Sequence, residues 1–80
     1  MKRSREEIIA QILNVCKTGA NKTRIVYQAN LNFRTVDPYL KTLIRNELIE
    51  VRPGEHVLYE TTQRGSNLLE TINQANEALR

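Results

Sequence analysis

Three basic side chains at helical spacing are the residues of this sequence best suited to binding chemistry. When residues are placed about 100° apart, as in an α-helix, Arg34, Lys41 and Arg45 fall within an arc of about 60°. A guanidinium can form paired hydrogen bonds to a guanine edge, and an ammonium neutralises a phosphate. Such a row therefore suits a polyanion. The flanking residues that can donate to phosphates are Thr35, Tyr39 and Thr42.

Two further groups of polar residues extend this candidate surface. Lys22, Thr23 and Arg24 combine side-chain donors with the free N–H groups expected at the start of a helix, which together suit a phosphate. Arg52 and His56 flank a predicted turn. Both groups are predicted to add contacts to the same partner.

The charge distribution bears on whether the basic row is functional. Such a row is often only the solvated face of a surface helix, and the nearby Asp37 would repel phosphate. However, residues 1–52 hold ten bases and five acids (+5), whereas residues 53–80 hold two and four (−2), which together give +3. The positive charge is thus concentrated around the row, which favours a polyanionic partner.

Apolar spacing and capping patterns predict the elements that position these side chains. Ser4 followed by Glu7 is a capping box, and the apolar residues after it repeat at helical spacing. Arg52–Glu55 contains a Pro-Gly turn between two segments rich in β-formers. The predicted elements are helices over Ser4–Lys17, Asn21 or Lys22 to Asn30, and Phe33–Asn46, strands over Leu48–Val51 and His56–Glu60, and a helix over Thr62–Arg80.

Pro38 complicates the third of these helices. Beyond the first turn of a helix, a proline removes a backbone hydrogen bond. Pro38 would lie among the first positions, whose N–H groups have no helical partner, if the regular helix began near Thr35. We therefore expect an irregular turn through Phe33 and Arg34.

The order of these elements predicts a mainly α fold with a small β-hairpin. Two helices joined by a short turn and followed by a hairpin make a winged helix-turn-helix, with three helices, a two-stranded wing and a C-terminal helix. We expect residues 1–61 to form this domain and residues 62–80 to form a dimerisation element. In such folds the second helix of the pair, here residues 34–46, enters the major groove of double-stranded DNA.

The last helix carries a short heptad pattern. The positions spaced as a, d, a and d are Leu69, Ile72, Asn76 and Leu79, and Leu68 and Ala75 widen the stripe. This pattern predicts a homodimer, although the first residues of the stripe can instead pack onto the domain's own core. Gly65 is expected to weaken the first turn by about 1 kcal/mol relative to alanine.

Composition argues against catalytic and membrane functions. Apolar residues make up 40% of the chain, with no run near the roughly 18 needed to span a membrane, and the N-terminus resembles no secretory signal. The lone Cys16 lies on an apolar stripe, His56 is the only histidine, and no Gly-rich phosphate loop is present. We expect a cytoplasmic protein that is not an enzyme and has no cofactor or metal.

The stretch GANKTRIVYQANLNFRTVDPYLKTLIRNELIEV resembles the small archaeal winged-helix DNA-binding proteins. The matching motifs are KT.I.Y.ANL from Lys22, YL..L....LIE from Tyr39 and T..G..LL..I from Thr62. The resemblance implies a DNA-binding transcription regulator or chromatin protein that dimerises, often through an antiparallel coiled coil of C-terminal helices. Pro38 and the short last helix depart from the family pattern. The alternatives are a non-specific chromatin architectural protein and a winged-helix module that binds protein only.

Overall fold

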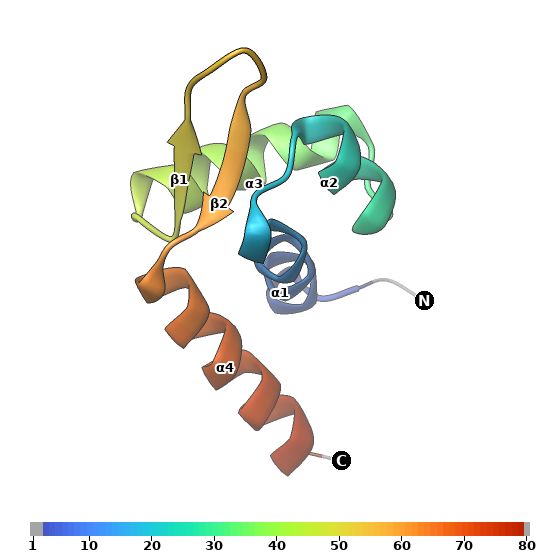
Figure 1. Cartoon of the computed structure of the whole chain (residues 1–80). Coiled ribbons are helices and arrows are strands. Elements are labelled where there is room, and N and C mark those ends of the chain that lie inside the picture. The colour runs from blue at the N-terminus through green and yellow to red at the C-terminus, as the bar shows by residue number, and fades with distance from the viewer. Residues whose placement is uncertain (1–2, 80) are drawn as a thin grey trace.

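The computed structural model describes residues 3–79 and contains four α-helices and one antiparallel hairpin (Figure 1). This order confirms the predicted winged helix-turn-helix architecture. Arg80, the predicted end of the last helix, lies outside the described residues. The elements are α1 (Arg5–Val15), the 3-10 turn η1 (Cys16–Thr18), α2 (Lys22–Gln28), α3 (Phe33–Arg45), β1 (Ile49–Arg52), β2 (Leu58–Thr61) and α4 (Gln63–Ala78).

A polar side chain caps the start of each α-helix. These side chains satisfy N–H groups of the first turn that have no partner within the helix. The bonds run from the N–H of Glu7 to Ser4 (3.1 Å), of Arg24 to Asn21 (2.8 Å), of Thr35 to Asn32 (2.7 Å) and of Gly65 to Thr62 (3.0 Å). The helix starts are therefore fixed by local sequence.

The predicted start of α3 near Thr35 is wrong. Because Asn32 caps the helix, regular structure begins at Phe33 and Pro38 is its sixth residue. The ring nitrogen of Pro38 cannot donate to the carbonyl of Arg34. Both residues are exposed, so this carbonyl lies on the solvent side, and the helix continues to Arg45.

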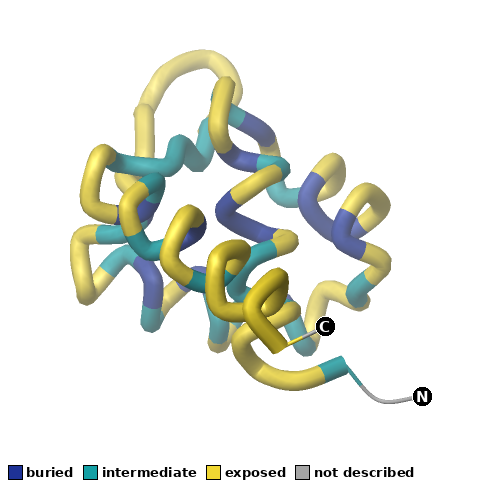
Figure 2. The backbone as a smooth tube through the Cα atoms, turned by 90° about the horizontal axis from the view of Figure 1, so that it is seen from below, coloured by how far each residue is buried: buried dark blue, intermediate teal, exposed yellow. Residues whose placement is uncertain are grey.

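The core lies where α1, α2, α3 and the start of β1 meet. Figure 2 shows the buried segments of these elements facing the centre of the domain. Thr61 at the end of β2 donates its hydroxyl to the carbonyl of Leu13, at 2.7 Å, which ties the hairpin to α1. The buried apolar side chains are Ile12, Leu13, Cys16, Ala20, Ile25, Val26, Ala29, Val36, Leu40, Leu43, Ile49 and Leu69.

The hairpin differs from prediction at its turn and in its pairing. β1 extends to Arg52, which pairs with Leu58, so residues 53–57 form the loop and His56 lies in this loop rather than in a strand. Ala20, in the segment before α2, exchanges two backbone bonds with Tyr59, at 3.0 and 2.8 Å. Ala20 thus pairs with the free side of β2 as a third segment of the sheet, which the alternation of apolar residues did not reveal.

The first half of α4 packs on the domain, and its second half extends into solvent (Figures 1 and 2). Leu69 is 4% exposed and lies beside α1, so it packs on the domain's own core, the alternative that the sequence left open for the start of the stripe. Residues 73–79 are all exposed, and the projecting helix gives the molecule extents of 43 × 28 × 19 Å.

Gly65 also has a role that helix propensity did not predict. A Cβ at this position would overlap the carbonyl oxygen of Leu48. Glycine therefore permits α4 to approach the end of the α3–β1 connection. Alanine at this position would not stabilise the helix as its propensity suggests, because its Cβ would overlap this carbonyl.

Candidate nucleic-acid interface

The basic row lies on the outer face of α3. Arg34, Lys41 and Arg45 are all exposed, whereas the opposite face of the helix is buried in the core. Among residues 3–79, Arg34 and Lys41 form no ion pair. Arg45 makes a long contact of 3.5 Å to the hydroxyl of Thr42. The structure therefore brings the predicted row together, with its charges facing solvent.

The residues that flank the row are less accessible than its cations. Thr35, Tyr39 and Thr42 are half-buried, and Tyr39 and Thr42 line a hollow together with Arg5 of α1. Of these, Tyr39 packs partly against the core.

Lys22 at the start of α2 is paired with Asp37 of α3. Its Nζ lies 2.7 Å from Asp37 Oδ1, and this hydrogen bond raises the pKa of Lys22. The pair crosses from α2 to α3 next to the basic row, so Asp37 neutralises one predicted phosphate ligand. Thr23 and Arg24 are exposed beside it, and Arg24 also donates to the carbonyl of Gly19, at 3.4 Å.

The wing carries fewer free cations than the sequence indicated. Arg52 Nε lies 2.8 Å from Glu60 Oε1 across the hairpin. The N–H of Arg52 is not aligned with that oxygen, which is buried and accepts no hydrogen bond. His56 is exposed in the loop at the end of the hairpin (Figure 1).

Two N-terminal arginines contribute to this region without having been predicted. Arg5 of α1 lines a hollow of about 260 Å³ with Pro38, Tyr39 and Thr42 of α3, which adds a cation next to the basic row. Arg3 donates to the carbonyl oxygens of Ala29 and Asn30, at 2.5 and 2.6 Å, after the end of α2. Only the tertiary fold brings these residues to α2 and α3, so helical spacing gave no signal for them.

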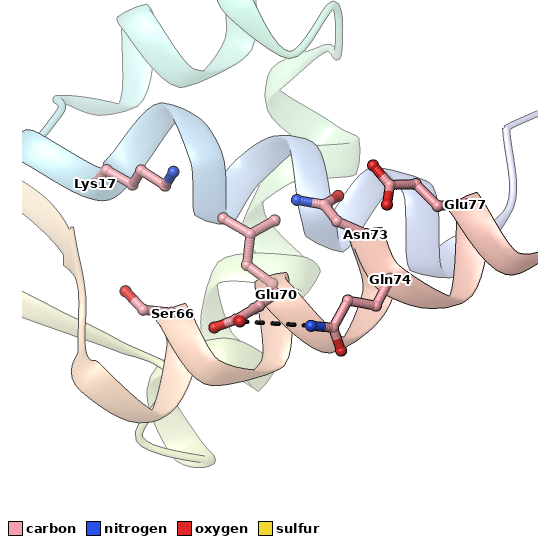
Figure 3. A pocket seen from close by; sticks show the side chains of 7 residues that line it. Lys17, Ser66, Glu70, Asn73, Gln74 and Glu77 are labelled. Carbon is pink, nitrogen blue, oxygen red and sulfur yellow. Dashed lines mark hydrogen bonds between the residues drawn. The ribbon is translucent and has the colours of Figure 1, made fainter.

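A second hollow, of about 430 Å³, lies along α4. Figure 3 shows Lys17 across from Ser66, Glu70 and Gln74, with Gln74 donating to Glu70 at 3.5 Å. Within residues 3–79, no group of three or more His, Cys, Asp or Glu side chains could hold a metal ion. The hollow is polar and open, and it has no geometry that suggests catalysis.

The predicted dimer surface on α4 is partly exposed. Leu68 and Ile72 are half-buried, whereas Ala75, Asn76 and Leu79 are exposed, and 84% of Leu79 is accessible. Without Leu69, the apolar stripe consists of Leu68, Ile72, Ala75 and Leu79, at spacings of four, three and four residues. This is again a spacing suited to helix pairing.

Cys16 is buried in the core. Its side chain is inaccessible, and burial raises the pKa of the thiol to about 12. None of the helices in residues 3–79 has the length and apolar character needed to cross a membrane.

The fold and the exposed basic helix define a winged helix-turn-helix protein. The family model described as winged helix-turn-helix matches residues 2–80, and the chain belongs to this family. The chain is 35% identical over 79 residues to the uncharacterized protein MJ0287 of Methanocaldococcus jannaschii, covering 98% of this chain and 78% of that protein. It is 37% identical over 75 residues to MJ0290 of the same archaeon, of which it spans only 34%.

A solved structure shows the same arrangement. The crystal structure of Sso10a-2, a DNA-binding protein from Sulfolobus solfataricus, aligns with a TM-score of 0.89 and 26% sequence identity. The alignment covers 95% of this chain and 81% of that chain. These similarities confirm the resemblance to archaeal winged-helix proteins.

Proposed function

We propose that this protein binds double-stranded DNA through the outer face of α3 and regulates transcription as a homodimer. The observation that carries the proposal is the exposed row of Arg34, Lys41 and Arg45, opposite the buried face of α3. In this family of folds the equivalent helix enters the major groove, where arginine can read guanine. The similarity to Sso10a-2, which is described as a DNA-binding protein, supports the same partner.

The remaining predicted contacts flank this row. Thr23 and Arg24 lie beside it on α2 and can contact a phosphate, and Lys22 can do so by exchanging Asp37 for that phosphate. Arg5 provides a further cation on the α1 side. Arg52 and His56 would approach the DNA backbone or minor groove from the wing.

The exposed half of α4 supports the proposed homodimer. Leu79 is 84% exposed at its end, and Ile72 and Ala75 continue the apolar stripe toward the domain. A second copy of α4 would cover this stripe. Asn76 next to it can fix the register of the two helices.

DNA binding is tested by measuring duplex affinity against salt concentration. The logarithm of the binding constant should fall with the logarithm of salt, and Arg34→Ala, Lys41→Ala and Arg45→Ala should each reduce the slope by about one. Lys17→Ala, which removes a cation on the α4 side, is the matched control. A flat salt dependence, or no loss in any α3 variant, would contradict the proposal.

The same experiment separates the alternatives when DNA sequences are selected from a random pool. A shared motif supports a regulator, whereas equal binding to all sequences indicates an architectural protein. No binding even at low salt indicates a module that binds protein alone.

A further inference from the structure

The hydrogen bonds around the hairpin determine which way each main-chain group of β1 points. The N–H of Thr62 donates to the carbonyl of Leu48, at 3.1 Å, and Tyr59 directs both of its main-chain groups to Ala20. Residues in an antiparallel pair alternate between bonding across the pair and pointing away from it. The β1–β2 register therefore has a fixed alternation.

The outer edge of β1 is left with unpaired groups. By this alternation Glu50 and Arg52 bond across to β2, whereas the N–H and C=O of Ile49 and Val51 point away from it. Within the described chain no strand pairs with this edge, which is the side of the sheet farther from α2 in Figure 1. Ile49 is 1% exposed, so Val51 presents the accessible part of this edge, and an open edge of this kind is a template for another strand.

A groove of about 580 Å³ follows the same edge. Its apolar lining comes from Ile44 at the end of α3 and from Ile49 and Val51 of β1, and 42% of Val51 is exposed. Glu47 and Glu50 also line the groove, and neither carboxylate forms an ion pair within residues 3–79. The groove thus combines unpaired main-chain groups, an apolar lining and two free negative charges.

We propose that this groove binds an extended, lysine- or arginine-bearing segment of a partner protein as a third strand beside β1. The partner's main chain would bond to the N–H and C=O of Val51, apolar side chains would cover the groove, and a cation would lie next to Glu47 and Glu50. Arg64 at the start of α4 bounds the groove and disfavours an acidic segment.

This site is separate from the basic row of α3. Ile44 lies on the apolar side of α3, about 90° around the helix from the basic row. The two surfaces also differ in charge, because the row is cationic whereas the groove carries two carboxylates and one guanidinium. Loss of one binding activity therefore does not imply loss of the other.

The probe for this site is a blocked heptapeptide of alternating lysine and valine. It is titrated to about 1 mM into the full isotope-labelled chain, a range in which weak strand pairing is detectable by NMR. Amide shifts should change at Ile44, Ile49 and Val51, and the amide of Val51 should become protected from exchange. The same peptide with glutamate in place of lysine should bind at least about tenfold more weakly.

Two sets of variants test the geometry. Val51→Pro removes an outward N–H but no β1–β2 bond, and it should weaken binding about tenfold, whereas Val51→Ala keeps that N–H and should retain amide protection. Glu47→Gln with Glu50→Gln should weaken the lysine peptide about fivefold while leaving the hairpin intact. The proposal is overturned by absent shifts at 1 mM peptide, by shifts confined to α3 or α4, or by pairing of β1 with a second copy of this chain.

Discussion

Gly65 and Leu48 are in such close contact that a side chain on Gly65 would overlap the Leu48 carbonyl oxygen. The same Cβ would lie 2.8 Å from Cγ2 of Thr61. The N–H of Thr62 donates to that carbonyl at 3.1 Å, so it cannot move away without breaking a backbone bond. The contact sets how closely α4 approaches the winged domain.

Gly65→Ala should therefore destabilise the protein. Helix propensity alone predicts a gain of about 1 kcal/mol, whereas the overlap predicts a loss of about 1–3 kcal/mol. Chemical denaturation of the wild-type and Gly65→Ala chains shows whether the free energy of unfolding rises or falls. Asn67→Ala, an exposed site two residues on, should change stability by less than about 0.5 kcal/mol, and a more stable Gly65→Ala chain would refute the close packing.

The thiol of Cys16 should react with a thiol reagent only after unfolding. Its side chain is buried, and its pKa is raised from 9.0 to about 12. The reaction of the Cys16 thiol with a chromogenic disulfide reagent at pH 8, followed by absorbance, should be slow in buffer and rapid in denaturant. Rapid reaction of the folded chain would mean that the core opens readily around α1.

Cys16 should also make stability fall in alkali. The unfolded chain loses the thiol proton near pH 9.0 while the folded chain keeps it until about pH 12, so the folded state binds more protons in this interval. Stability then decreases by up to about 1.4 kcal/mol for each pH unit. Cys16→Ala should start from a lower stability but lack this contribution, and parallel pH profiles for the two chains would contradict the assignment.

Asp37→Asn should strengthen binding to duplex DNA. The substitution removes a negative charge next to the basic row and releases Lys22 from its 2.7 Å ion pair. The plot of the logarithm of the binding constant against the logarithm of salt concentration should become steeper, by an amount that corresponds to up to about one additional phosphate contact. Glu70→Gln on α4 removes the same charge far from the row and should have no effect; an unchanged slope for Asp37→Asn would exclude Lys22 from the interface.

Leu79→Asp should convert the proposed dimer to a monomer. Light scattering of the parent chain should give about twice its mass of 9.3 kDa. Because Leu79 is 84% exposed, the substitution should not unfold the monomer. Tyr27→Asp, at a residue 78% exposed on α2, is the control and should remain a dimer. A parent chain near 9.3 kDa at all concentrations would reject self-association.

The parts of the structure set by local sequence were predictable. Ser4, Asn21 and Thr62 cap helices that begin where the sequence indicated, because a cap bonds to an N–H only three residues away. The buried and basic faces of α3 followed from helical spacing in the same way. The start of α3 was mispredicted, because the Asn32 cap prevailed over the expected effect of Pro38.

The parts set by contacts between distant residues were not predictable. Nothing in the spacing of Lys22 and Asp37 shows that the fold pairs them, and Arg5 reaches α3 only because α1 packs beneath it. Leu69 and Leu79 fit one heptad stripe, yet only Leu69 has a place in the core, because the domain ends halfway along α4.

The two backbone bonds between Ala20 and Tyr59 make the wing and α2 a single unit. Ala20 lies two residues before α2, and Tyr59 lies in the inner strand of the hairpin, so neither can shift without the other. A partner that contacts both the wing and α2 would not have to fix their relative position on binding, because the folded protein already holds them in place. Weakening this bridge should therefore lower the affinity for such a partner even when every contacting side chain is intact.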